Sequence, residues 1–380
     1  MGTEDLARSG DARRIIDLVG RGVATSRSQL AESLGLAPST VGLRVQALLE
    51  VGLLREEGAG VSRGGRRPRV LRVDDAGGEV LSVEIGGAHA RIGRHSLTGT
   101  LLHAQTFPVR LADGPRPVLS AVIDRLHATA ADHPVRAVGV SLPGPVDTAT
   151  GAVDQPSRMP GWPGFPVGGH LSSALGVPTF VDNDANLAAL GEHRARFGST
   201  GHSITVKAGT AIGSGIIVDG RIHRGATAAA GDISHTRIDG AAAVPCSCGN
   251  VGCLETVASG AGLVRQLRER GIDAAHTEDV LRRARDADPA ATSLVRMAGT
   301  HLGQVLSGVV NFFNPHAVFL TGSLSAAEPF LAAVRSRVYE ACHPLVTQTL
   351  TIEAAQTGPD AVLLGAARLA IDELPVTATV

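Results

Sequence analysis

Three cysteines and one histidine lie close together between residues 231 and 255, and this cluster constrains the fold more than any other feature. The cysteines follow the pattern C-x-C-G-x-x-G-C, and the histidine stands eleven residues before the first of them. The four residues are His235, Cys246, Cys248 and Cys253. Imidazole and thiolate groups at such spacings are typical ligands of tetrahedral zinc. Gly249 and Gly252 permit the tight turns that bring the last thiolate back to the others.

The cluster predicts a structural zinc site, because four protein ligands saturate the metal and leave no position for an activated water. We therefore expect the metal to shape a pocket and to perform no chemistry. Two other interpretations stay open at this point. One is a reduced loop with scattered thiols, and the other is a disulfide between Cys246 and Cys253.

Composition indicates an ordinary globular protein. The 380 residues, 43% of them hydrophobic and 19% charged, suggest two or three domains with sizeable cores. Arginine supplies all but one of the 35 basic residues, and we attribute this bias to the genome, with Lys207 as the single lysine. The acidic start indicates no signal peptide, and the uncharged stretch 160–181 contains too many prolines and glycines to span a membrane. We expect a cytoplasmic protein with reduced thiols that does not engage membranes.

The first 75 residues have the pattern of a winged helix-turn-helix. Apolar residues at helical spacing predict a first helix that ends near Gly20, a second that starts at Ser26, and a third that starts at Pro38. Ser26 and Gln29 fit an S-x-x-Q capping box. In helix-turn-helix modules, the second helix of the motif enters the major groove of DNA. Here that reading helix would be the third of the chain.

Two expected strands, residues 53–56 and 70–73, flank a loop that contains the basic sequence Arg-Gly-Gly-Arg-Arg-Pro. Arginines on a glycine-rich wing can reach phosphates or a narrow minor groove. A small helical dimerisation domain with a solvated basic loop is the alternative. The expected DNA contacts are Ser39, Thr40, Arg44 and Gln46 from the third helix and Arg63, Arg66 and Arg67 from the wing.

From residue 79 onward, short apolar strands alternate with helical stretches, which is the pattern of an α/β architecture. A glycine-rich turn at 209–215 offers backbone N–H groups to an anion. The string Asp-Asn-Asp-Ala-Asn at 182–186 opens a helix, where an aspartate often acts only as a cap. The strands are expected at 80–85, 137–142, 178–181, 203–206, 215–218 and 318–320.

The order of these motifs resembles the ROK family (repressors, open reading frames and sugar kinases), and the winged module resembles its transcriptional-regulator branch. The basic wing, the Asn-Asp-Ala-Asn string and the histidine–cysteine block carry the resemblance, which spans residues 12–369. It implies an α/β fold in which a winged helix-turn-helix precedes a two-lobed, actin-like, hexokinase-type domain. The implied domains are the DNA-binding module 1–75, a first lobe 76–190 plus 356–380, and a second lobe 191–355 with the zinc loop.

The resemblance also implies a sugar site. Asp184 would bind sugar hydroxyls and would be the general base in a kinase, while Asp232 is one methylene shorter than the family's usual glutamate. His235 would bind zinc through one ring nitrogen and sugar through the other. The implied sugar-binding residues are Gly144, Asn183, Asp184, Asp232, His235 and Glu255.

The nucleotide side departs from the kinase pattern. The first phosphate loop of the kinase branch reads Asp-x-Gly-Gly-Thr, whereas this chain has Glu84 in place of the aspartate and Ala88 in place of the threonine. Ala211 replaces a glycine of the second loop, and Thr321-Gly322 replaces a Gly-Gly pair. Phosphoryl transfer depends on positioning and charge stabilisation, so these losses compound.

The sequence therefore favours a regulator, not an enzyme, that binds a sugar effector and a double-stranded DNA operator as a homodimer or homotetramer. One alternative is an ATP-dependent sugar kinase with a DNA-binding domain, in which Asp184 is catalytic. The other is a constitutive DNA-binding protein with a vestigial cleft.

Overall fold

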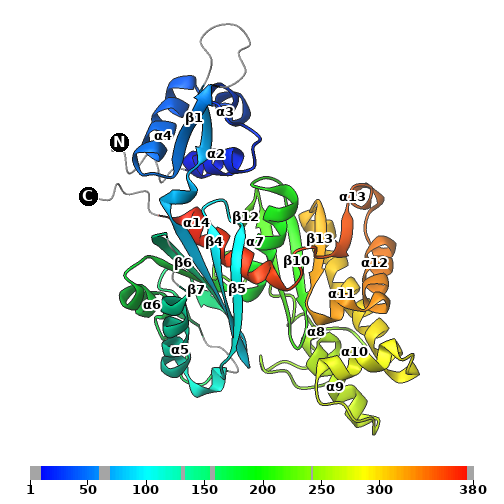
Figure 1. Cartoon of the computed structure of the whole chain (residues 1–380). Helices are drawn as coiled ribbons and strands as arrows, with labels where there is room; N and C mark the ends of the chain where they lie inside the picture. Colours follow the sequence, from blue (N-terminus) through cyan, green and yellow to red (C-terminus); the bar gives the residue numbers. More distant parts are fainter. Residues whose placement is uncertain (1–9, 60–68, 130–132, 155–158, 241–242, 375–380) are drawn as a thin grey trace. The chain divides into compact units, whose positions relative to one another are not determined.

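The computed structural model describes residues 10–59, 69–129, 133–154, 159–240 and 243–374 (Figure 1). The chain forms two compact units, residues 1–182 with 366–380 and residues 183–365. Within the described ranges, no helix combines the length and the apolar character that a membrane span requires.

Among the described residues, the N-terminal part of the first unit forms three helices and a two-stranded antiparallel sheet, as the sequence predicts. The elements are α2 (Gly10–Gly20), α3 (Arg27–Leu34), α4 (Pro38–Glu50), β1 (Leu54–Ala59) and β2 (Arg69–Val73). Ser26 caps α3 by accepting the N–H of Gln29. The Gln29 side chain accepts the N–H of Thr25 at 3.0 Å. The expected capping box would instead place this bond on the Ser26 N–H, so its second half forms one residue early.

The core of the winged module continues into the rest of the first unit. Ile15, Leu30 and Leu48 of the module belong to the same buried cluster as Val80 and Ala370. Ala370 lies on the C-terminal helix α14 (Ala361–Glu373). The module therefore packs against the C-terminal helix and shares a hydrophobic core with the rest of the first unit.

A five-stranded mixed sheet forms the α/β part of the first unit, with strand order β5-β4-β3-β6-β9. Its central pair, β3 and β6, is parallel. The strands are β3 (Glu79–Ile85), β4 (His89–Ser96), β5 (Leu101–Pro108), β6 (Val135–Leu142) and β9 (Thr179–Asn183). The remaining elements are α5 (Pro115–Ala128), α6 (Val167–Leu175) and the short pair β7 (Val146–Asp147) and β8 (Ala152–Val153).

The second unit contains another five-stranded sheet, in the order β12-β11-β10-β13-β14. The strands are β10 (Ser203–Ala208), β11 (Ile212–Val218), β12 (Arg221–Ile222), β13 (Ala317–Thr321) and β14 (Thr351–Ala354). The helices are α7 (Asp184–Phe197), α8 (Leu254–Ala258), α9 (Gly260–Glu269), α10 (Thr277–Arg285), α11 (Pro289–Phe313), α12 (Glu328–Ala341) and α13 (Pro344–Thr347). The first residues of α14 also belong to this unit.

The predicted α/β class is confirmed, and each predicted strand is present with ends shifted by a few residues. The predicted turn at 209–215 is wrong in its second half, because β11 begins at Ile212 and pairs with β10. Only residues 209–211 connect these two strands. The sequence analysis missed β4, β5 and β14, and also the two-residue strands β7, β8 and β12.

Close backbone packing fixes helix α7 in the second unit. A Cβ on Gly191 would overlap the carbonyl of Ala361, and a Cβ on Gly365 would overlap the carbonyl of Leu187. Both approaches join α7 to the first turns of α14. Glycine is required at these positions because any larger side chain would push the two helices apart.

Candidate functional site

The four predicted metal ligands meet in the second unit. One ligand atom from each of His235, Cys246, Cys248 and Cys253 lies within 4.8 Å of all the others. The Cys248 and Cys253 sulfurs are 3.7 Å apart, and Nδ1 of His235 lies 3.4 Å from the Cys246 sulfur. Zinc with bonds of about 2.3 Å to sulfur and about 2.0 Å to nitrogen separates tetrahedral ligands by roughly 3.6–3.8 Å. The donor set and its spacing therefore fit a four-coordinate metal.

Neither alternative for this loop matches the structure. The cysteines are free, so no disulfide joins Cys246 to Cys253. The thiols are also not scattered, because the backbone folds back at Gly249 and Gly252, whose φ angles are +90° and +70°. These left-handed conformations favour glycine, as the sequence analysis expected. The loop is closed by bonds such as that from the Cys246 N–H to the Asn250 carbonyl at 2.8 Å.

The thiols differ in their pKa. Burial raises the pKa of the Cys253 thiol to about 12, whereas a backbone hydrogen bond from Asn250 lowers the pKa of Cys248. Only a thiolate binds metal, so metal binding must displace a proton from Cys253. The buried sulfur would then exchange a proton for a coordinate bond.

The first residues of strand β11 contact Glu255 and the chain neighbours of Asp184 and Asp232. Glu255 accepts the N–H of Ile212 at 2.8 Å. Gly231, which precedes Asp232, accepts a hydrogen bond from the Ser214 hydroxyl. A Cβ on Gly213 would lie 3.0 Å from the Cβ of Ala185, the residue after Asp184. Three consecutive residues of β11 thus make these contacts: Ile212 with Glu255 of α8, Gly213 with Ala185 of α7, and Ser214 with Gly231.

Asn183 and Asp184 have different roles at the start of α7. The side-chain oxygen of Asn183 caps the helix by accepting the N–H groups of Ala185 and Asn186 at 2.9 and 3.3 Å. Asp184 is therefore not the cap, although the sequence left that role open. A ligand hydroxyl would meet the Asn183 amide as a hydrogen-bond donor.

The Asp184 carboxylate faces Lys207, the only lysine of the chain. The Lys207 ammonium donates to Oδ2 of Asp184 at 2.7 Å, and the two side chains are 32% and 24% exposed. The sequence analysis did not predict a role for Lys207 in the site and considered it only as part of the arginine bias. The feature of the sequence that pointed to the site is the position of Lys207 near the end of β10, just before the turn at 209–211.

Gly144, the remaining predicted sugar residue, belongs to the first unit and follows strand β6. Its φ of +93° is a conformation that favours glycine. His235 presents Nδ1 to the Cys246 sulfur, so Nε2 is the nitrogen that could face a ligand.

The acid of the first phosphate loop is engaged inside the protein. Glu84 lies directly opposite Arg91 in the β3–β4 pair, and their side chains approach to 3.5 Å. Both side chains are nearly covered, with 14% and 15% exposed. The residue that stands in place of the kinase branch's aspartate is thus paired with an arginine.

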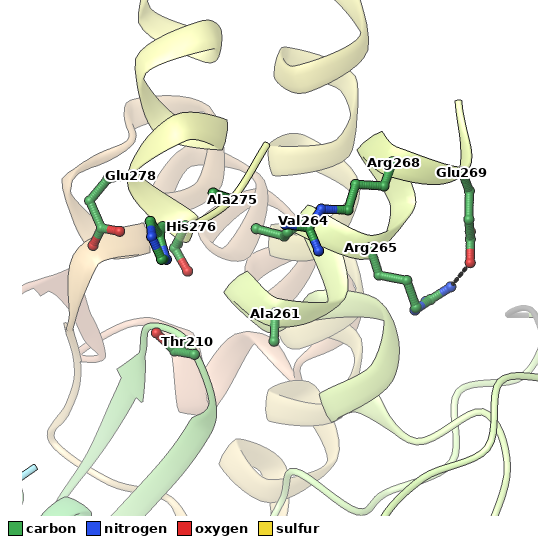
Figure 2. A pocket seen from close by; sticks show the side chains of 10 residues that line it. Thr210, Ala261, Val264, Arg265, Arg268, Glu269, Ala275, His276 and Glu278 are labelled. Carbon is green, nitrogen blue, oxygen red and sulfur yellow. Dashed lines mark hydrogen bonds and ion pairs between the residues drawn. The ribbon is translucent and has the colours of Figure 1, made fainter. Parts of the chain in front are cut away.

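A pocket of about 590 Å³ lies in the second unit between α9, the start of α10 and Thr210 (Figure 2). None of the predicted sugar-binding residues lines it. Its two arginines are held by protein acceptors: Arg265 donates to Glu269 at 2.5 Å, and Arg268 donates to the Ala274 carbonyl at 2.6 Å. Asp184, Asp232 and Glu255 thus lie outside the lining of this pocket.

The predicted DNA-reading residues lie on α4. Ser39 and Gln46 are exposed, and Thr40 is half-buried. Arg44 turns toward α2, where it pairs with Asp11 at 3.0 Å and keeps only 12% of its side chain exposed. The three wing arginines lie outside the described residues: Arg63, Arg66 and Arg67.

Comparison with known proteins identifies the family. The family model described as "ROK family" matches residues 80–373. The chain belongs to the ROK family. A putative xylose repressor from Caldicellulosiruptor sp. (strain Rt8B.4) is 28% identical over 373 residues, which covers 92% of each chain.

Two solved structures extend this comparison. A ROK family transcriptional regulator, described as a homolog of E. coli MLC, superposes with a TM-score of 0.82 over 98% of both chains at 26% identity. A ROK family glucokinase from Streptomyces griseus, in complex with glucose and AMPPNP, gives a TM-score of 0.68 at 28% identity. That match covers 77% of this chain and 99% of the glucokinase. The predicted two-lobed, actin-like fold behind an N-terminal helical module is therefore confirmed.

Proposed function

We propose that this ROK protein is a sugar-responsive transcriptional regulator, of the repressor type, that binds an operator in double-stranded DNA. The observation that supports this most is the extent of the similarity. The match to the repressor and to the transcriptional regulator runs through the N-terminal module, whereas the glucokinase match covers 77% of the chain. As a DNA-binding regulator, the protein would act in the cytoplasm, as a homodimer or homotetramer.

We assign the effector site to Asn183, Asp184, Asp232, His235 and Glu255, with the Gly144 backbone as a further contact. The first five residues lie in one compact unit, in which hydrogen bonds link Glu255 to β11 and His235 to the metal loop. Carboxylates and amides are the groups that pair with the many hydroxyls of a sugar. A structural zinc on the four ligands would fix the His235 ring in place.

The phosphate side of the site departs from the kinase pattern. Glu84 stands where the kinase branch has an aspartate, and its carboxylate is opposed by Arg91. We therefore propose that the protein binds its effector without phosphorylating it. The similarity to a glucokinase keeps a sugar kinase as the second candidate.

For the DNA interface, we propose Ser39, Thr40, Arg44 and Gln46 on α4, together with the arginines of the wing. Arg44 would have to exchange its ion pair with Asp11 for a base or phosphate. A sugar can alter DNA binding only by favouring one of two arrangements of the winged modules. We retain the three modules 1–75, 76–190 plus 356–380, and 191–355 as the functional division.

Electrophoretic mobility shift with the DNA upstream of the gene itself tests the proposal. We expect binding that weakens when an effector from a panel including D-xylose, D-glucose and N-acetylglucosamine is added. Arg66→Ala with Arg67→Ala should weaken binding and flatten its salt dependence, because phosphate contacts release counterions. Sugar-dependent ATP turnover that disappears in Asp184→Asn would instead establish the kinase. Binding that no sugar alters would support the constitutive alternative.

A further inference from the structure

Helix α4 carries a large apolar side chain on its solvent-exposed face. Leu43 is 59% exposed. The opposite face of the helix packs into the core of the winged module through Val41, Val45 and Leu48, each of which is fully buried. Exposed leucines are common on protein surfaces, so the meaning of this one depends on its position.

Leu43 lies in the middle of the helix face that the sequence predicts to read DNA. Ser39, Leu43 and Gln46 follow the spacing i, i+4, i+7, which places them in one stripe along the helix. Ser39 and Gln46 are exposed, as Leu43 is. Arg44 lies off this stripe, and its guanidinium pairs with Asp11 of α2 at 3.0 Å. The centre of the predicted reading face is therefore apolar.

The two ends of α4 differ in a way that favours one orientation on DNA. Ala37, the residue before the helix, has no side-chain acceptor, so the N–H groups of the first turn suit a phosphate. At the other end, Glu50 continues the stripe and accepts from the Gln46 amide at 3.1 Å. Phosphates repel this carboxylate. We therefore expect the N-terminal half of α4, which includes Leu43, to lie deepest in the major groove, as in other recognition helices.

The major groove offers one apolar partner to such a side chain. Ser39 and Gln46 can form hydrogen bonds with base edges or phosphates, whereas a leucine forms none. The C5 methyl group of thymine is the apolar group in this groove, and the other base edges present donors and acceptors. Leu43 placed against those polar edges would remove them from water without replacing their hydrogen bonds. Against a thymine methyl, both apolar surfaces leave water, which is favourable.

We propose that Leu43 is a specificity-determining residue of the DNA interface, which contacts the C5 methyl group of a thymine at one fixed position in each operator half-site. This inference rests on the proposed DNA-binding function. It adds an apolar contact to the polar residues assigned to α4, and it adds a base that the operator must contain. The same contact disfavours cytosine, which lacks the methyl group and presents an amino group in the groove.

The test removes the methyl group from the DNA and the leucine from the protein, singly and together. The original full-length protein first selects duplexes from a random-sequence pool. A selected duplex is then synthesised with thymine or with uracil, which lacks only the C5 methyl group. Fluorescence anisotropy at one fixed salt concentration gives both dissociation constants for the original protein, Leu43→Ala and Leu43→Met. Leu102→Ala is the matched control, because Leu102 of β5 is exposed to a similar extent, 52%.

We expect uracil to weaken binding by the original protein about 4-fold for each half-site, the ratio that burial of one methyl group contributes. Leu43→Ala should bind the thymine duplex more weakly and should bind both duplexes equally. Leu43→Met should keep the preference for thymine, because methionine is apolar and similar in volume. Leu102→Ala should behave as the original protein does. Uracil at single positions then identifies the thymine that Leu43 contacts.

Two results overturn the inference while the proposed DNA binding stands. The first is the same ratio of the two dissociation constants for the original protein and for Leu43→Ala. The second is a changed oligomeric state of Leu43→Ala in sedimentation velocity, which would assign Leu43 to a contact between protein chains. If the original protein enriches no duplex from the pool, the proposed function and the role of Leu43 fail together.

Discussion

His193 anchors the helix that presents Asp184, and its protonation provides a quantitative test of the structure. The imidazole is completely buried on α7. Its Nε2 lies 2.9 Å from the Thr200 carbonyl, which can only accept, so Nε2 carries the proton. Nδ1 lies 2.8 Å from the Ser203 hydroxyl, from which it accepts when the ring is neutral. Burial favours this neutral ring, because a buried imidazolium would lose its hydration.

Burial lowers the pKa of His193 from 6.5 to about 4. The stability that depends on the neutral ring is fully present above pH 6.5, where the ring is neutral in the folded and in the unfolded chain. Below pH 6.5 the unfolded chain binds a proton that the folded protein does not, so stability falls until about pH 4. At about 1.4 kcal/mol per pH unit, the free energy of unfolding decreases by about 3 kcal/mol across this window.

His193→Gln removes the titration and keeps one donor and one acceptor. Urea unfolding of both proteins, followed by circular dichroism between pH 7 and pH 4, gives the free energies. We expect the difference between the two proteins to change by about 3 kcal/mol over this range. His202→Gln, at a partly exposed histidine, is the control. Parallel pH profiles for the original protein and His193→Gln would refute the assignment of a neutral, buried ring.

Three further predictions concern the metal, the winged module and the helix contact. Cys246→Ser should lose bound zinc, measured by plasma mass spectrometry, whereas Cys342→Ser should retain it; equal metal contents would exclude the four-ligand site. Arg368 pairs with Asp17 of α2 at 3.4 Å, so Arg368→Met should destabilise the module and increase hydrogen exchange in α2. Gly365→Ala should cost about 1–3 kcal/mol by overlap with the Leu187 carbonyl, and an unchanged melting temperature would contradict that contact.

The metal ligands were predictable because they are local in the chain. His235 and Cys253 are separated by 18 residues, and the glycines between them determine the turns. The pairing of Asp184 with Lys207 was not predictable, because the two residues come from different elements that only the packing of α7 on β10 and β11 brings together. Short motifs thus report local geometry, whereas this pair depends on the tertiary fold.

The missed strand β5 and the misplaced side chain of Arg44 both reflect limits of sequence periodicity. Strand β5 is an edge strand with several exposed positions, so it lacks the apolar pattern that predicts a strand. Arg44 was assigned to the DNA-facing side of α4 from helical periodicity. Periodicity gives the direction of the Cα–Cβ bond, but a long side chain can turn back, and Arg44 reaches Asp11 on α2.

The contacts of α14 suggest how effector binding could reach the winged module. In the second unit, the first turns of α14 pack against α7, whose N-terminus presents Asp184. In the first unit, Arg368 and Ala370 of the same helix contact Asp17 and the core of the module. Because these contacts occur on one continuous helix, a displacement of α7 on sugar binding would be transmitted as a displacement of α14. We therefore expect Arg368→Met to weaken the sugar response of operator binding even where sugar affinity is unchanged.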